Sequence, residues 1–148
     1  MSLAFQAIFA RLREILQKHS KALFVMDDKP NRYRVEADAG PAVIKAWHGN
    51  RVKRPMMPVA WVQIKRTCVS YHLIGIYGKP ELRDGMSNEL RALMQGETCF
   101  NFKTKDEALF REIDGLTRKS IVAIRKDGFI TKPKASDRAL PKPSGSTV

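Results

Sequence analysis

Residues 59–76 read VAWVQIKRTCVSYHLIGI and predict a β-hairpin. Its two arms are expected at residues 59–64 and 68–76, with Lys65-Arg66 at the turn. Two strands that follow each other without a helix between them pair in antiparallel fashion, because a parallel crossover needs about a dozen residues or more. The hairpin therefore predicts that the sheet of this protein is mainly antiparallel.

Further strands flank the hairpin on both sides. Residues 23–26 form a short apolar run, residues 27–31 have the composition of a turn, and residues 98–102 read as another strand. Residues 33–38 alternate between apolar and charged side chains, which places one side of that strand in the core and the other in water. The segment 39–58 is rich in Gly, Pro and basic residues and is expected to be a loop.

Helical patterns lie at both ends of the folded part. Ser2 is a suitable N-cap for a first helix, whose apolar stripe is Phe5, Ile8, Phe9, Leu12, Ile15 and Leu16. Thr104 and Glu107 have the spacing of a capping box at the start of a last helix, and residues 126–128 end that helix with a cation and a glycine. The apolar face of this last helix is Leu109, Phe110, Ile113, Leu116, Ile121 and Ile124. Two shorter helices are expected between the hairpin and the last strand, around 81–83 and over 87–94.

This order of elements predicts an α+β fold: a mainly antiparallel sheet of about five strands, with the N- and C-terminal helices packed on one face. Residues 1–130 are expected to form a single domain. Residues 131–148 contain Lys, Pro and Ser with few large apolar side chains, so we expect a disordered basic tail there.

Composition limits the class of protein. The chain has 148 residues, 43% hydrophobic and 28% charged, and its 27 Lys and Arg against 15 Asp and Glu give a net charge of +12. These values exclude a membrane span, a disulfide-rich secreted scaffold, a collagen-like fibre and a wholly disordered chain. No signal-peptide pattern precedes the first helix, and Cys68 and Cys99 form no Cys-x-x-Cys pair, so a cytoplasmic protein with two free thiols is expected.

Basic residues are concentrated in one acid-free span. Residues 39–80 contain no Asp or Glu, and their cations are Lys45, Arg51, Lys53, Arg54, Lys65, Arg66 and Lys79. Arg51, Lys53 and Arg54, with Trp47 nearby, are the predicted anion-binding residues, because cations neutralise phosphates and an aromatic ring stacks on a base. The expected partner is an anionic ligand or acidic partner, including nucleic acid, and no membrane partner is expected. The alternative interpretation is a solvated surface without a partner.

A second candidate site lies on two strands. If the apolar residues of these strands face the helices, then Ser70, His72, Cys99 and Asn101 share the opposite face and form a candidate pocket. As an enzyme, this site would use Cys99 as the nucleophile, His72 as its base and Asn101 as the orienting group. The alternative is an inert cysteine and a structural histidine. The sequence contains no metal-ligand spacing and no P-loop, dinucleotide-binding or nucleophile-elbow motif, so no metal and no cofactor are predicted.

Three segments carry a resemblance to a known group of proteins. They are Val69-Ser70-Tyr71-His72-Leu73, Pro80-Glu81-Leu82, and residues 94–103, which read MQGETCFNFK. They resemble a group of small uncharacterised bacterial proteins, and the layout of residues 3–130 is more distantly similar to the YdhG-like domain-of-unknown-function family. This resemblance implies a compact α+β sheet domain.

One branch of that wider family is associated with frataxin-like iron delivery. Iron-donor surfaces present clustered carboxylates, whereas residues 39–80 contain none. An iron chaperone is therefore disfavoured. The sequence favours a non-enzymatic cytoplasmic domain that binds an anionic ligand or partner. The alternatives are a nucleic-acid-binding accessory protein, an enzyme that uses Cys99 and His72, and an interaction module that self-associates through a sheet edge.

Overall fold

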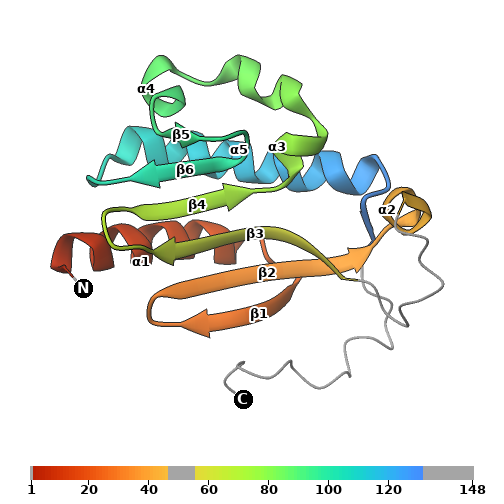
Figure 1. Cartoon of the computed structure of the whole chain (residues 1–148), viewed down its shortest axis with the longest axis horizontal. Coiled ribbons are helices and arrows are strands. Elements are labelled where there is room, and N and C mark those ends of the chain that lie inside the picture. Colours follow the sequence, from red (N-terminus) through yellow and green to blue (C-terminus); the bar gives the residue numbers. More distant parts are fainter. Residues whose placement is uncertain (1, 47–55, 132–148) are drawn as a thin grey trace.

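The computed structural model describes residues 2–46 and 56–131, and it consists of one antiparallel sheet with helices on one side (Figure 1). The strands are β1 (Phe24–Lys29), β2 (Arg32–Ala39), β3 (Met56–Ile64), β4 (Val69–Leu73), β5 (Met94–Gln95), β6 (Cys99–Phe102) and β7 (Ile130–Thr131). The helices are α1 (Leu3–Lys18), α2 (Pro41–Ala46), α3 (Gly75–Gly78), α4 (Asn88–Arg91) and α5 (Glu107–Lys126), and Pro80–Gly85 forms a 3₁₀ turn.

The predicted α+β class and antiparallel sheet are confirmed. The strand order is β1-β2-β3-β4-β6-β5, and β7 pairs with the end of β2. The sheet has seven strands rather than about five. The additional strands β5 and β7 have 2 residues each, which is too short to produce an alternating pattern.

The two long helices cover the same face of the sheet, as predicted (Figure 1). The buried side of α1 is Ile8, Phe9, Leu12, Ile15 and Leu16, and Ser2 caps this helix by accepting a hydrogen bond from the amide of Phe5 at 3.0 Å. All six apolar residues expected on the face of α5 are buried. Between helix and sheet, the hydroxyl groups of Tyr71 and Thr117 lie 2.7 Å apart.

The ends of several elements differ from the prediction. The first strand continues through Asp27 and Asp28, which were assigned to a turn. Aspartate is unfavourable in strands, but Asp28 forms an ion pair with Arg13 of α1, and Asp27 forms one with Arg34 of the neighbouring strand. These partners, distant in sequence, explain why the strand does not stop at Met26.

The hairpin and the segment after it also differ in detail. The amide of Lys65 donates to the carbonyl of Cys68 at 2.8 Å, so the turn consists of residues 66–67. β4 ends at Leu73, and residues 75–78 form α3. Gly75 lies so close to α5 that a Cβ atom there would overlap Oγ of Ser120.

The remaining differences concern short elements and one cap. The helix expected over residues 87–94 ends at Arg91, and the expected loop 39–58 contains α2 and the start of β3. α5 is capped by Asp106, whose side chain accepts from the amide of Ala108 at 3.0 Å, and not by a capping box. Thr131, the first residue of the predicted tail, pairs with Asp38 in the sheet. Residues 132–148 lie outside the described part, so the tail itself stays a prediction.

Candidate functional site

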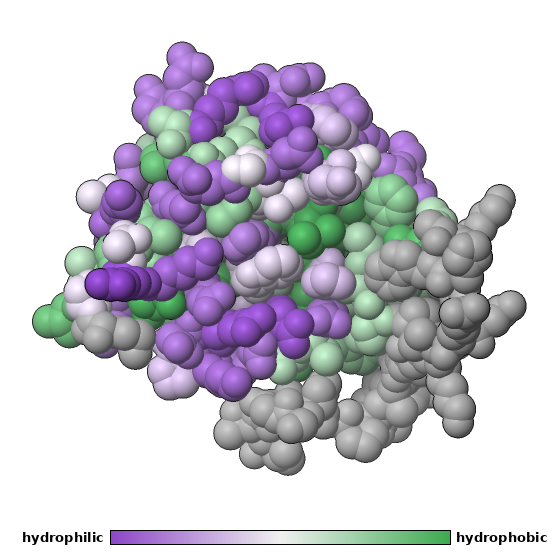
Figure 2. Space-filling model, viewed as in Figure 1, coloured by the Kyte–Doolittle hydropathy of each residue, from purple (hydrophilic) through white to green (hydrophobic). Residues whose placement is uncertain are grey.

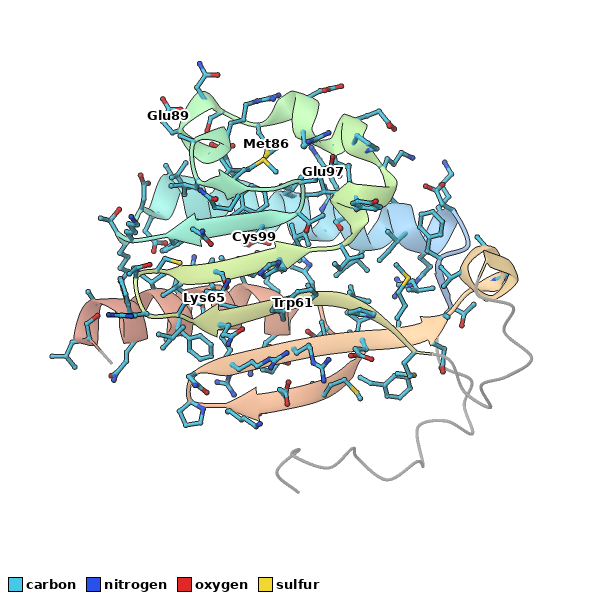
Figure 3. All side chains as sticks on the ribbon, in the orientation of Figure 1. Trp61, Lys65, Met86, Glu89, Glu97 and Cys99 are labelled. Atoms are coloured by element: carbon cyan, nitrogen blue, oxygen red, sulfur yellow. The ribbon has the colours of Figure 1, made fainter. Side chains whose placement is uncertain are left out.

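One face of the sheet is covered by no helix of the described part, and this open face points toward the reader in Figures 1 and 3. Side chains on it alternate with the buried ones along each strand. The cross-strand neighbours on β3, β4 and β6 are Trp61 with His72, Gln63 with Ser70, His72 with Cys99, and Ser70 with Asn101. We call these six residues the open-face cluster.

The cluster contains all four residues of the predicted pocket. Sequence alternation placed Ser70 and His72 on one side of β4, and Cys99 and Asn101 on one side of β6. The structure makes these two strands neighbours, with Ser70 opposite Asn101 and His72 opposite Cys99. The four residues therefore lie together on the open face, although Ser70 itself is fully buried beneath its neighbours.

His72 stacks on Trp61 of the adjacent strand. The ring centroids are 4.4 Å apart and the ring planes differ by 16°. Burial, and then the positive charge of Lys65, lower the pKa of His72 from 6.5 to about 4. The imidazole is therefore neutral at pH 7, with one donor and one acceptor nitrogen. No side chain of the described residues forms a hydrogen bond with either nitrogen.

The environment of Cys99 keeps its sulfur protonated. Burial raises the pKa of the Cys99 thiol, and the opposing effect of Lys65 does not offset it. The Sγ atom donates to Oδ1 of Asn101 at 3.3 Å, and no hydrogen bond joins it to His72 in the described structure. A catalytic thiolate needs a lowered pKa and a base within reach, so this geometry gives no support to the thiol and histidine enzyme.

Lys65 supplies the positive charge of the site. It is exposed directly after β3, and the alternation of that strand places it on the same side as Trp61 and Gln63 (Figure 3). Its positive charge acts to lower the pKa of both His72 and Cys99. No carboxylate within residues 2–46 and 56–131 lies within ion-pair distance of Lys65. The cation is therefore available to a ligand.

The other half of the open face is charged, and its cations form ion pairs within the protein. We define the strand charge cluster as Asp27, Lys29, Arg32, Arg34 and Glu36, on β1 and β2. The carboxylate of Asp27 lies 3.8 Å from Lys29, 3.2 Å from Arg32 and 3.1 Å from Arg34, and Glu36 lies 2.8 Å from Arg34. Hydrophilic residues gather over these two strands in Figure 2. Their cations already have anionic partners inside the protein.

A separate apolar cavity of about 240 Å³ lies at one end of the sheet, where α2, β3, α3 and the segment before β7 meet. Its walls are Ala42, Val43, Met57, Ile74, Tyr77, Gly78 and Phe129. None of the four predicted pocket residues lines this cavity. Their role as a pocket thus stays a prediction about the open face.

The predicted anion-binding residues Trp47, Arg51, Lys53 and Arg54 lie outside the described residues. Within the described part, no three His, Cys, Asp or Glu side chains come together in a way that could hold a metal ion. The same part contains no helix that is both long and apolar enough to cross a membrane.

The sequence does not predict three members of the site, Trp61, Gln63 and Lys65. All three belong to the predicted hairpin, but they are not predicted to lie beside the four pocket residues. The signal that could have found Trp61 is the hairpin register: a two-residue turn at 66–67 pairs Ile64 with Val69 and therefore Trp61 with His72. The expected turn at Lys65-Arg66 gives a different register.

Comparisons with protein-family models, with curated proteins and with solved structures each return no match to this chain. The resemblance to the YdhG-like family accordingly stays a prediction, and the candidate site depends on its own geometry.

Proposed function

We propose that the protein is a non-enzymatic binding domain that holds an anionic ligand on the open-face cluster, next to Lys65. The observation that carries the proposal is a cation without a carboxylate partner in the described structure, beside polar groups with unused hydrogen-bonding capacity. These groups are the ring nitrogens of His72 and the amide nitrogen of Asn101. A charge-assisted hydrogen bond from Lys65 is the strongest contact that such a surface offers.

The ring pair defines the other part of the proposed ligand site. Trp61 and His72 form a stacked wall between the strand charge cluster and Cys99. An apolar or planar body of the ligand would pack along this wall, while its anionic group meets Lys65. The neutral state of His72 favours this arrangement, because a neutral imidazole can accept or donate one hydrogen bond without a fixed charge.

The wider setting belongs to the same proposal. Both cysteines are free thiols, which supports a cytoplasmic location. Arg51, Lys53 and Arg54 remain the predicted additional anchors, with Trp47 beside them. The similarity to the YdhG-like family adds no activity to this proposal.

NMR titration of the full chain with inorganic phosphate and with adenosine monophosphate tests the proposal. We expect shifts of the amide signals of His72, Cys99 and Asn101, and a rise in the pKa of His72 when the anion binds, because an anion favours the protonated ring. Lys65→Gln should weaken binding about tenfold, as the loss of one charge-assisted hydrogen bond predicts.

The matched control is Lys21→Gln, which neutralises an exposed lysine between α1 and β1. It should leave the affinity unchanged. An equal loss in both variants, or no shift at the open-face cluster with either anion, would contradict the proposal.

A further inference from the structure

A row of cations follows the outer side of α5, away from the sheet. It consists of Arg111, Arg118, Lys119, Arg125 and Lys126, and we call it the α5 basic stripe. At 100° per residue these positions fall within about 120° of the helix circumference. Four of the five side chains are exposed and Arg125 is half-buried. α5 lies behind the sheet in Figure 1, so its outer side is separate from the open face.

The carboxylates of α5 are all directed to other partners. Glu107 forms an ion pair with Arg11 of α1 at 3.2 Å, and Glu112 accepts from the backbone amide of Ser87 at 3.1 Å. Asp114 binds Lys18 and His19, each at 2.6 Å.

None of the five stripe cations has a carboxylate within ion-pair distance in the part of the chain that the structure describes. The positive charge of α5 is thus uncompensated on its outer side.

Gly115 lies within the stripe and is surrounded by three of the stripe cations. Gly115 lies one turn after Arg111 and one turn before Arg118 and Lys119, so all three cations are its neighbours on the helix surface. Glycine destabilises a helix interior relative to alanine. Packing in the described part of the chain does not require it, because beyond the backbone of α5 itself no described atom lies within 4 Å of a Cβ placed at Gly115. What the glycine provides is bare backbone between three cations, which lets an anion approach closely.

From this arrangement we infer that the α5 basic stripe binds the phosphate backbone of double-stranded nucleic acid, with a phosphate seated over Gly115. Arg111 and Lys126 are 15 residues apart, which corresponds to about 22 Å of helix. A duplex presents negative charge continuously over such a length.

The exposed stripe contains no aromatic, Asn or Gln side chain, so it can contact phosphates but has few means to distinguish bases.

Other polyanions fit the stripe less well. A membrane-surface helix needs an apolar side to insert, and Val122 is the one exposed large apolar residue of α5. The buried centre of a protein interface is apolar as well, and one exposed valine does not supply such a centre. Single-stranded nucleic acid is held largely by stacking on aromatic rings, which the stripe lacks.

Fluorescence anisotropy with the full chain and a labelled DNA duplex of roughly 20 base pairs tests the inference. Each phosphate contact contributes about −0.9 to the slope of log K against log salt concentration. Arg118→Gln/Lys119→Gln should therefore make the slope less steep by about 1.8. Two duplexes of unrelated sequence should bind with equal affinity.

The matched control removes the same charge elsewhere. Lys21→Gln/Arg66→Gln neutralises two exposed cations that lie outside α5, and it should leave the slope unchanged. An equal change in both double variants would overturn the inference, because binding would then follow net charge alone.

Gly115→Leu tests whether a phosphate lies over Gly115 or whether binding depends on the charge of the stripe alone. It keeps every charge and replaces a poor helix former with a good one, so circular dichroism should show an intact fold while duplex affinity falls several-fold. Unchanged affinity would refute the seat. Tighter binding to phosphatidylserine vesicles or to polyglutamate than to the duplex would refute the nucleic-acid assignment. Lys65→Gln should leave duplex binding intact, so this inference and the proposed function can fail independently.

Discussion

The strand charge cluster on β1 and β2 and the α5 basic stripe are both rich in cations. The cations of the cluster are paired with carboxylates, whereas within the described part of the chain those of the stripe are not. In the cluster, Arg32 and Arg34 lie within 3.2 Å of the carboxylate of Asp27, whose side chain is only 13% exposed. On α5, four of the five cations are exposed to water, and the nearby carboxylates bind groups of α1 or of the backbone. The same residue types thus stabilise the sheet in one region and remain available to a partner in the other.

This difference separates structural charge from functional charge. A cation near a half-buried carboxylate is required by that carboxylate, so its removal affects folding. A cation in water contributes little to folding, so its removal mainly affects binding. Mutations of the two regions should therefore fall into distinct classes, and the following predictions test that separation.

The largest effect is expected for Asp27→Asn. This change removes the carboxylate that Arg32 and Arg34 share, and it leaves Glu36 as a partner of Arg34 alone. Exposed pairs contribute up to about 1 kcal/mol and removal of one partner of a buried pair costs about 3–5 kcal/mol, so we expect a loss of about 2 kcal/mol for this partly buried network. Urea denaturation of the variant measures it.

Asp84→Asn is the control for Asp27→Asn. Asp84 is an exposed carboxylate with no ion pair in the described structure. Its removal should change the free energy of unfolding by no more than about 0.5 kcal/mol. Similar losses in the two variants would mean that the network of Asp27 does not stabilise the sheet.

Much of the fold could be predicted from the sequence because its strong signals are local. The period of three and four residues identified α1 and α5, and the period of two correctly placed Ser70 with His72, and Cys99 with Asn101. What alternation cannot supply is which strands are neighbours. β4 and β6 are separated by residues 74–98, and their pairing depends on the packing of the whole sheet.

Ion pairs are also difficult to predict from the sequence, because their two partners lie on different elements. Asp27 and Asp28 were assigned to a turn because local propensity is unfavourable, while the arginines that keep them in a strand lie on α1 and β2. The acid-free span 39–80 drew attention to Arg51, Lys53 and Arg54. The sequence does not indicate the α5 basic stripe, because Glu107, Glu112 and Asp114 are interspersed with its cations. Only the structure reveals that those acids face other partners.

The protonation of His72 shows whether the open face can hold a positive charge without an anionic partner. Its pKa is lowered to about 4, so between pH 6.5 and 4 the unfolded chain binds a proton that the folded protein does not. Stability should accordingly fall as pH decreases through this window, with a smaller effect than that of Asp27→Asn because the ring is partly exposed. An NMR titration of the imidazole and unfolding curves at several pH values measure both quantities.

The variant His72→Gln keeps a polar side chain that does not titrate. It should remove the part of the acid sensitivity that arises between pH 6.5 and 4. If His72 instead titrates near 6.5 in the folded protein, then the open face tolerates an unpaired cation and no longer differs from α5 in this respect.

The smallest effect on stability is expected where the effect on binding is largest. Arg118→Gln/Lys119→Gln removes two solvated cations from α5, and without duplex present the free energy of unfolding should change by no more than about 0.5 kcal/mol. No gain is expected either, because Arg111 lies two turns away and no other cation of α5 is three or four residues from Arg118 or Lys119, the spacing at which like charges repel each other on a helix. Urea denaturation without the duplex measures this change in the free energy of unfolding.

The same measurement with the duplex tests binding. The duplex should stabilise the wild type more than the variant, because a ligand that binds the folded state more tightly stabilises it more. A loss of 2 kcal/mol without duplex would instead mean that these cations have structural partners, and α5 would then belong to the same class as the strand charge cluster.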